Sequence, residues 1–281
     1  MAEGKKKRLE IFVVVKGHPF DRNAFEAMVV GMGMEPTMVD QPAAAALLNP
    51  DAMARYDAIL FYDMPGLDFR APAAERPHFM EPEPAFKAGF QALLEQGKGM
   101  VMMHHAIAGW PAWPLYNEML GGIFLYKPTQ IMGRDRPESG YLGDVSYTAR
   151  RAESDHPVLA GVPERFDLTD ELYLGEIHDQ PGVEPLLYLD TPIDPARFNS
   201  ALHAVRGVGE AEAPWVRPAL NPLLGWAKAA GNSPLVYLQP GDSAATYADA
   251  TYRLLLGNAL RWVASPEGAQ WARAKVSERV A

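Results

Sequence analysis

Cysteine is absent from the 281 residues of this chain, and its absence removes several kinds of chemistry. Without a thiol the chain can form no disulfide, no zinc–thiolate site and no cysteine nucleophile.

Long apolar runs and an excess of positive charge are also missing. The sequence has no stretch of the ~18 apolar residues that would suggest a membrane span. The apolar run 11–15 is followed by Lys16 and is too short for a signal peptide. With 26 basic and 35 acidic residues, the net charge of −9 argues against nucleic acid or an anionic membrane as partner. We expect a cytoplasmic protein whose basic run 5–8 is a solvated tail.

Apolar residues, at 48% of the chain, are plentiful enough for a large core, and their spacing alternates along the first half. Continuous apolar runs at 9–15, 57–62 and 99–103 predict strands buried on both faces. Helical spacing between Phe25 and Met32, and again over 84–96, predicts intervening helices. This alternation predicts an α/β fold: three layers around a doubly wound, mostly parallel sheet of the flavodoxin-like type.

The second half of the chain is less regular. Residues 141–152, 183–189 and 234–238 are candidate strands, and 248–264 fits a helix. We expect one domain over 1–281, because no repeat or clear linker interrupts it. It would carry two long loops rich in proline or glycine.

These two loops cover about 64–84 and 191–222. Long irregular loops inside a compact domain are usually functional or mobile.

Polar side chains follow three of the predicted strands. His18 follows the first, Asp63 the second, and His104 and His105 the third. Because ligands of open α/β sheets bind at the carboxyl ends of the strands, these residues predict a small-molecule site. Each has a structural alternative: a helix cap for His18, a turn for Asp63, and a core position for one histidine of the pair.

Four stretches carry a family resemblance: GKGMVMMHHA (97–106), YNEMLGGIF (116–124), DHPVLAGVPERFDLTDELYLGE (155–176) and VYLQPGDSAATYADATYRLLLGNALRWV (236–263). Together they resemble the ThuA-like, or trehalose-utilisation, family. The resemblance implies a class I glutamine-amidotransferase-like fold. In amidotransferases, the nucleophilic cysteine lies at a tight turn, the elbow, directly after the strand that corresponds to 99–103. The resemblance implies that His104 occupies this elbow, so the chain is not a glutaminase.

The resemblance also directs the choice of site residues. Since successive strand residues face opposite ways, one ring of the histidine pair should face the cleft, and the elbow position favours His104. The family commonly has Gly-His after its last core strand, where this chain has Gly241-Asp242. That difference weakens a metal-site interpretation and makes Asp242 a candidate for substrate binding.

The resulting hypothesis is an enzyme acting on a sugar or related polyhydroxylated molecule. His104 would act as acid or base with Glu171 or Asp63, in hydrolysis, isomerisation or elimination. Tyr173, on the face of Glu171 if the segment is a strand, would contact substrate. The remaining candidates for substrate contact are His18, His105, Trp110 and Asp242.

Two alternatives stay open. A metal-dependent hydrolase could use His18, His104 and either Asp63 or Glu171 as ligands of a divalent metal. No HExxH-like pair supports such a site. No other cofactor is expected. A non-catalytic sugar-binding protein could use the same cleft, with loop 64–84 closing over the ligand. A homo-oligomer is compatible with the Met-rich segment 28–34, but core packing explains that segment equally well.

Overall fold

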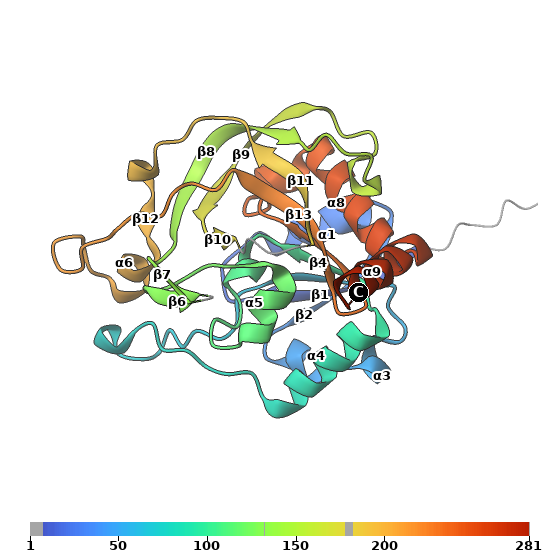
Figure 1. Cartoon of the computed structure of the whole chain (residues 1–281), viewed down its shortest axis with the longest axis horizontal. Helices are drawn as coiled ribbons and strands as arrows, with labels where there is room; N and C mark the ends of the chain where they lie inside the picture. The colour runs from blue at the N-terminus through green and yellow to red at the C-terminus, as the bar shows by residue number, and fades with distance from the viewer. Residues whose placement is uncertain (1–7, 132, 178–181, 281) are drawn as a thin grey trace, which may run out of the picture.

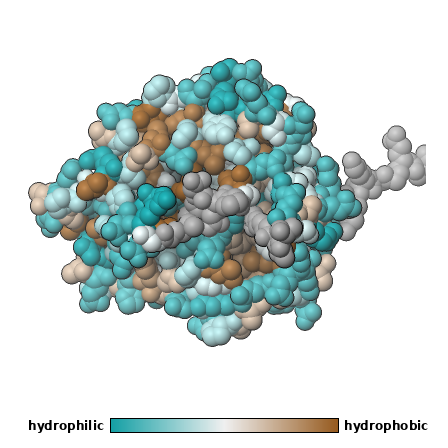
Figure 2. Space-filling view, in the orientation of Figure 1, coloured by the Kyte–Doolittle hydropathy of each residue, from teal (hydrophilic) through white to brown (hydrophobic). Residues whose placement is uncertain are grey.

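The computed structural model describes residues 8–131, 133–177 and 182–280. Residues 5–7 of the basic run lie outside these ranges; Arg8, its last residue, is exposed and lies 3.6 Å from Glu35. None of the described helices is long and apolar enough to cross a membrane. Figure 2 shows the surface of the molecule in the orientation of Figure 1. Hydrophilic side chains predominate on this face, with apolar patches between them.

A ten-stranded mixed sheet forms the centre of the molecule (Figure 1). Its parallel half has the order β2 (Met34–Asp40), β1 (Leu9–Lys16), β3 (Ala58–Asp63), β4 (Met100–Met103) and β14 (Ser233–Leu238). An antiparallel half continues from β14 through β13 (Leu223–Ala230), β11 (Val183–Leu189), β8 (Gly140–Arg151) and β12 (Asn199–Ser200), and β9 (Arg165–Leu174) pairs with β8.

Helices cover both faces of the sheet, as the sequence predicted for a three-layer α/β fold. One face carries α1 (Arg22–Gly31), α7 (Ala244–Ala248), α8 (Ala250–Val263) and α9 (Pro266–Val280). The other carries α2 (Ala43–Leu47), α3 (Pro50–Met53), α4 (Pro84–Gln96) and α5 (Pro114–Leu120). Short strands β5 (Gly122–Ile123), β6 (Thr129–Ile131), β7 (Arg134–Arg136) and β10 (Glu176–Ile177) complete the architecture.

Strand β1 shows why a continuous apolar run predicts a strand that is buried on both faces. Its side chains alternate between two cores: Ile11, Val13 and Val15 pack with α1 and α8, whereas Phe12 and Val14 face the layer of α4. A strand covered on both faces has no solvated side, so all its fully buried positions, 11–15, are apolar. The start of α1 is capped, because the Asp21 carboxylate accepts a hydrogen bond from the Ala24 N–H at 2.9 Å.

The two long loops are only partly irregular, and they touch each other. Segment 64–83 contains one 3₁₀ turn at Ala73–Glu75, and segment 191–222 contains β12 and helix α6 (Ala201–Arg206). Arg76 donates a hydrogen bond to the Val205 carbonyl at 3.3 Å, and Arg206 donates one to the Arg76 carbonyl at 2.5 Å. These bonds join the two loops beside the carboxyl ends of the parallel strands. The sequence did not predict β9, β13 or α9.

Gly99, just before β4, allows the sheet to approach α8 closely. A Cβ on Gly99 would lie 2.0 Å from the Val263 carbonyl oxygen, a backbone atom that cannot move aside cheaply. We expect Gly99→Ala to lower the free energy of unfolding by about 1–3 kcal/mol through overpacking. Urea unfolding checks this, with Gly209→Ala as control because a Cβ there meets open space. Equal midpoints for both variants would contradict the expectation.

Candidate functional site

The two adjacent histidines lie at a sharp turn after β4. The strand ends at Met103, and the 3₁₀ helix η2 (His104–Ala108) begins with His104, whose φ is 44°. This left-handed conformation is unusual for a residue with a Cβ and redirects its side chain away from the strand alternation. The two rings therefore do not point to opposite sides, as strand alternation predicted: both approach Asp242.

The His104 ring is fully buried and held at both nitrogens. Its Nδ1–H donates to the Gln239 carbonyl at 2.6 Å, and its Nε2 lies 3.2 Å from Glu171 Oε2. The ring also stacks on Tyr173, with centroids 4.6 Å apart. Burial alone would lower the pKa of His104, but its hydrogen bond to Glu171 and the charges of Glu171, Asp170 and Asp242 raise it above the ordinary value.

The environment of His105 lowers its pKa, in contrast to that of His104. Its Nδ1 lies 2.9 Å from the Tyr173 hydroxyl, and its Nε2 lies 3.3 Å from Asp242 Oδ1 without hydrogen-bond alignment. Burial and the adjacent charge on His104 lower the pKa of His105 to about 3. A neutral His105 beside a charged His104 fits an arrangement in which the Tyr173 hydroxyl donates to His105 Nδ1.

Asp242 is fixed by its own backbone. Asp170 on β9 accepts hydrogen bonds from the Gly241 N–H at 2.5 Å and the Asp242 N–H at 3.1 Å. The hydroxyls of Tyr62 and Tyr247 donate to the Asp242 carbonyl. Although burial alone would raise it, the nearby His105 and His104 lower the pKa of the Asp242 carboxyl to about 2. The residue that departs from the family pattern is thus an ionised member of the cluster.

A cavity of about 230 Å³ opens next to this cluster. Glu171 and Tyr173 from β9 and the half-exposed His18 form its polar side. The lining is completed by Met64, Phe69, Ala108, Phe124, Tyr126, Tyr141, Ala201, Ala204 and Val205. Both long loops therefore contribute to its wall. Its volume is below the ~300–1,000 Å³ of drug-sized ligand sites, which favours a small ligand.

Glu171, rather than His104, faces this cavity. The Glu171 side chain is 14% exposed and lies at the cavity wall, whereas the His104 ring is 0% exposed and lies behind it. Glu171 and Tyr173 share the cavity side of β9, as the period of two predicts for a strand. A ligand in the cavity would meet the carboxylate first, with the imidazole as its buried partner.

Asp63 lies at the predicted sheet edge but on the other face of the sheet. Its Oδ2 accepts a hydrogen bond from Gln41 Nε2 at 2.7 Å, and its Oδ1 is buried without a hydrogen-bond partner among the described residues. Within that part of the chain, no hydrogen bond or ion pair joins Asp63 to His104. The preceding residue, Tyr62, points the other way and packs its ring 5.0 Å from His105.

Trp110 also lies away from the cluster. Its φ is 44°, its ring packs 5.4 Å from Phe86, and it is not among the described residues that line the 230 Å³ cavity. The other predicted substrate contacts, His18, His105, Tyr173 and Asp242, lie together. The His18 ring packs against His105 at an angle of 48°, with centroids 4.3 Å apart, and its Nδ1 is 4.0 Å from Asp242 Oδ1.

Gln239 and Asp170 are the positioning residues that the sequence did not indicate. Gln239 follows β14; its carbonyl accepts from His104, and its side-chain oxygen accepts from the Tyr173 N–H at 3.0 Å. It thereby links the elbow to β9. Any residue can supply a backbone carbonyl, so the residue type at position 239 could not predict this hydrogen bond. Gln239 does, however, lie inside the family-like VYLQPGD stretch. Asp170 precedes Glu171 in the same TDELY segment.

Four side chains of the cluster form a set that fits a divalent metal ion. One ligand atom from each of His104, His105, Glu171 and Asp242 lies within 4.8 Å of all the others. Three of the separations are 3.2, 3.3 and 3.7 Å. Tetrahedral zinc with bonds of ~2.0–2.1 Å separates its ligands by about 3.3–3.4 Å. The outer ring nitrogens already contact Gln239 and Tyr173, as orienting partners of metal-bound histidines do. Neither Asp63 nor the exposed His18 belongs to this set.

Comparisons with solved structures agree with this architecture. A ThuA-like protein from Parabacteroides merdae is 13% identical, with 92% of this chain and 91% of that chain covered and a TM-score of 0.64. A ThuA-like protein from Bacteroides uniformis is 18% identical, with 92% of each chain covered and a TM-score of 0.59. PurLQS from Thermotoga maritima is 13% identical over 91% and 99% of the two chains, with a TM-score of 0.50. At these identities the likeness establishes the fold alone.

The search of curated proteins found no match. The family model described as "ThuA: Trehalose utilisation" matches residues 12–263, which include the whole cluster and both long loops. The chain therefore belongs to the trehalose-utilisation (ThuA) family.

Proposed function

We propose that this protein is an enzyme that transforms a sugar or a related polyhydroxylated small molecule by acid–base chemistry. The observation that carries the proposal is the contact between His104 Nε2 and Glu171 Oε2, 3.2 Å long, at the wall of a small cavity. The family's link to trehalose utilisation supports a sugar-related role. The chemistry itself is argued from the residues.

Each group has a defined task in this proposal. Glu171 is the catalytic carboxylate and exchanges a proton with the ligand. His104 is a positioning residue: it holds Glu171 and carries the compensating charge, because its Nδ1–H is fixed on Gln239 and its pKa is raised. His18 and Tyr173 supply hydrogen bonds to ligand hydroxyls. Phe124 offers an aromatic face to the C–H groups of a sugar ring.

A panel of keto-sugars and glycosides tests the proposal by turnover. We expect His104→Gln to lower kcat about 100-fold on any substrate found, because glutamine keeps a donor toward Glu171 but cannot take up a proton. His156→Gln is the matched control: His156 is also buried but packs on Trp262, away from the cavity. Binding of a sugar without conversion, or equal turnover in both variants, would contradict the acid–base role.

A metal-dependent hydrolase is the second candidate, and the ligand-like spacing of the four-residue set favours it. His104, His105, Glu171 and Asp242 would hold the ion, which would supply Lewis-acid activation of a water or carbonyl. In that state His105 would present an unprotonated Nε2 to the ion and donate from Nδ1 to Tyr173, the reverse of the tautomer expected without metal.

Zinc binding is expected to raise the melting temperature if this second candidate is correct. A ligand at about 100 times its Kd that binds only the folded state stabilises it by about 2.7 kcal/mol. We expect this shift, and about one zinc per chain by elemental analysis, to be lost in Asp242→Asn and kept in Asp135→Asn, an exposed control. Full turnover of chelator-treated, metal-free protein would rule the candidate out.

A further inference from the structure

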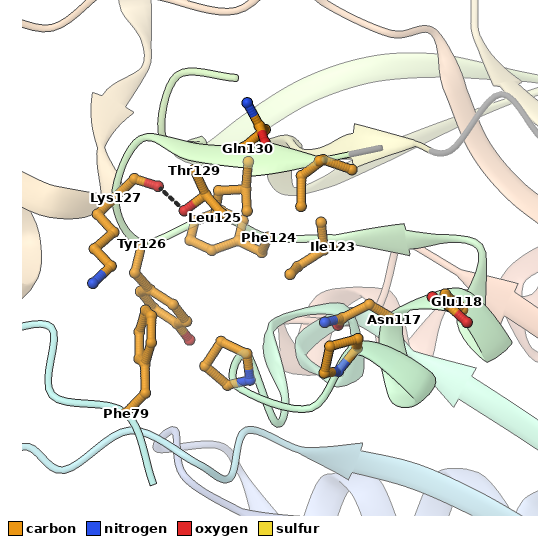
Figure 3. A pocket seen from close by; sticks show the side chains of 13 residues that line it. Phe79, Asn117, Glu118, Ile123, Phe124, Leu125, Tyr126, Lys127, Thr129 and Gln130 are labelled. Atoms are coloured by element: carbon orange, nitrogen blue, oxygen red, sulfur yellow. Dashed lines mark hydrogen bonds between the residues drawn. The ribbon is translucent and has the colours of Figure 1, made fainter. Parts of the chain in front are cut away.

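A second and larger cavity lies beside the first. Its volume is about 450 Å³, and Figure 3 shows its lining side chains. Three segments build it: loop 64–84 through Phe79, the segment 111–118 that leads into and includes the start of α5, and the stretch 123–131. Phe79 and Tyr126 lie together on one side, with ring centroids 6.2 Å apart, and Asn117 lies on the opposite side (Figure 3).

The lining is mainly aliphatic and aromatic, with one buried polar group left unsatisfied. Asn117 is 6% exposed, and its side-chain oxygen has no hydrogen-bond partner among the described residues. The Asn117 side chain lies at the wall of the cavity (Figure 3). A buried acceptor without a donor costs about 1–3 kcal/mol, so a ligand that donates a hydrogen bond there would recover this loss.

The two cavities share a wall. Phe124 and Tyr126 line both of them, and loop 64–84 contributes Phe69 to the smaller and Phe79 to the larger. The smaller cavity has carboxylate, imidazole and phenol groups at one side, whereas aliphatic and aromatic side chains form most of the lining of the larger, with Asn117, Glu118, Lys127, Thr129 and Gln130 as its polar members. A ligand that reached from the titratable groups of the smaller cavity into the larger one would meet mainly apolar side chains there, which suits a molecule with one polar and one apolar part.

We propose that the larger cavity binds the apolar part of a conjugated sugar. The ligand is a glycoside whose sugar lies at Glu171 and whose aromatic or alkyl substituent packs against Phe79, Phe124 and Ile131. This inference rests on the proposed function, because it takes the sugar to lie at Glu171. Asn117 adds selectivity for substituents that carry a hydrogen-bond donor, such as a phenol hydroxyl.

The test compares two glycosides and a sugar-free probe by calorimetry: phenyl β-D-glucopyranoside, methyl β-D-glucopyranoside and 1-naphthol. We expect 1-naphthol to bind and the phenyl glucoside to bind about tenfold more tightly than the methyl glucoside. Ile131→Trp, at a half-buried position of β6, should fill the cavity and remove both effects. Asp135→Trp, exposed on the paired strand β7, should remove neither.

Two results would overturn the inference: equal binding of the two glucosides, or a phenyl advantage and naphthol binding that persist in Ile131→Trp. Absence of binding by all three probes at millimolar concentration would overturn it as well. Failure of the proposed function looks different. In that case Glu171→Gln leaves turnover unchanged, while the phenyl preference and its loss in Ile131→Trp remain.

Discussion

Replacing Glu171 with glutamine is expected to lower kcat about 1,000-fold on the sugar substrate while the protein stays folded. The glutamine side chain has nearly the same shape, so packing against Tyr173 and the cavity wall should persist. It can neither accept a proton from the ligand nor balance the charge of His104, whose raised pKa depends on the carboxylate. The pKa of His104 should therefore fall in the variant.

Turnover and histidine titration followed by NMR measure the two effects in the same protein. Glu164→Gln is the matched control, because Glu164 is an exposed carboxylate that pairs with Arg165 just before β9. Its turnover should be unchanged. If Glu171→Gln kept its turnover within about threefold of the wild type, Glu171 could not be the proton-exchanging group.

Replacing Asp63 with asparagine is expected to change how stability depends on pH. Burial raises the pKa of the Asp63 carboxyl to about 7 from an ordinary value of 3.8, although its hydrogen bond to Gln41 favours the ionised form. Between these two pH values the unfolded chain releases the proton while the folded chain keeps it. The wild type therefore loses stability as the pH rises from about 4 to 7, by about 4 kcal/mol in total at most.

Asp63→Asn has no such proton to lose. The variant should unfold with nearly the wild-type free energy at pH 4, where the wild-type carboxyl is neutral as well. It should become more stable than the wild type above pH 7, by up to about 4 kcal/mol. Urea unfolding across this range measures the difference, with exposed Asp135→Asn as control. A variant that is equally or less stable at pH 8 would contradict the burial of an uncompensated carboxyl.

The elements that the sequence predicted best are those with a local signal. Strand β1 has an unbroken apolar run at 11–15, and α1 and α4 have their apolar residues at helical spacing. The strands β9 and β13 were missed because each has a charged residue at a buried position, Asp170 in β9 and Lys228 in β13, which interrupts the apolar pattern. Lys228, for example, lies buried inside β13 and donates to the Met119 carbonyl at the end of α5.

The site was predicted in part, and each error has a geometric cause. Strand-end reasoning selected Asp63, but the pleat turns that side chain away and brings Tyr62 toward His105 instead. The alternation argument for the histidine pair failed because β4 ends one residue before it. Asp242, taken as a sign against a metal, supplies a carboxylate 3.7 Å from His104 Nε2. The Gln239 carbonyl could be found only from the fold.

The double variant His104→Gln/Glu171→Gln tests the central claim most directly. Groups that act as one unit lose their effect together, so the double variant should turn over within about threefold of Glu171→Gln alone. If the two losses instead multiplied, to about 100,000-fold, the imidazole and the carboxylate would be working independently. That result would contradict the account.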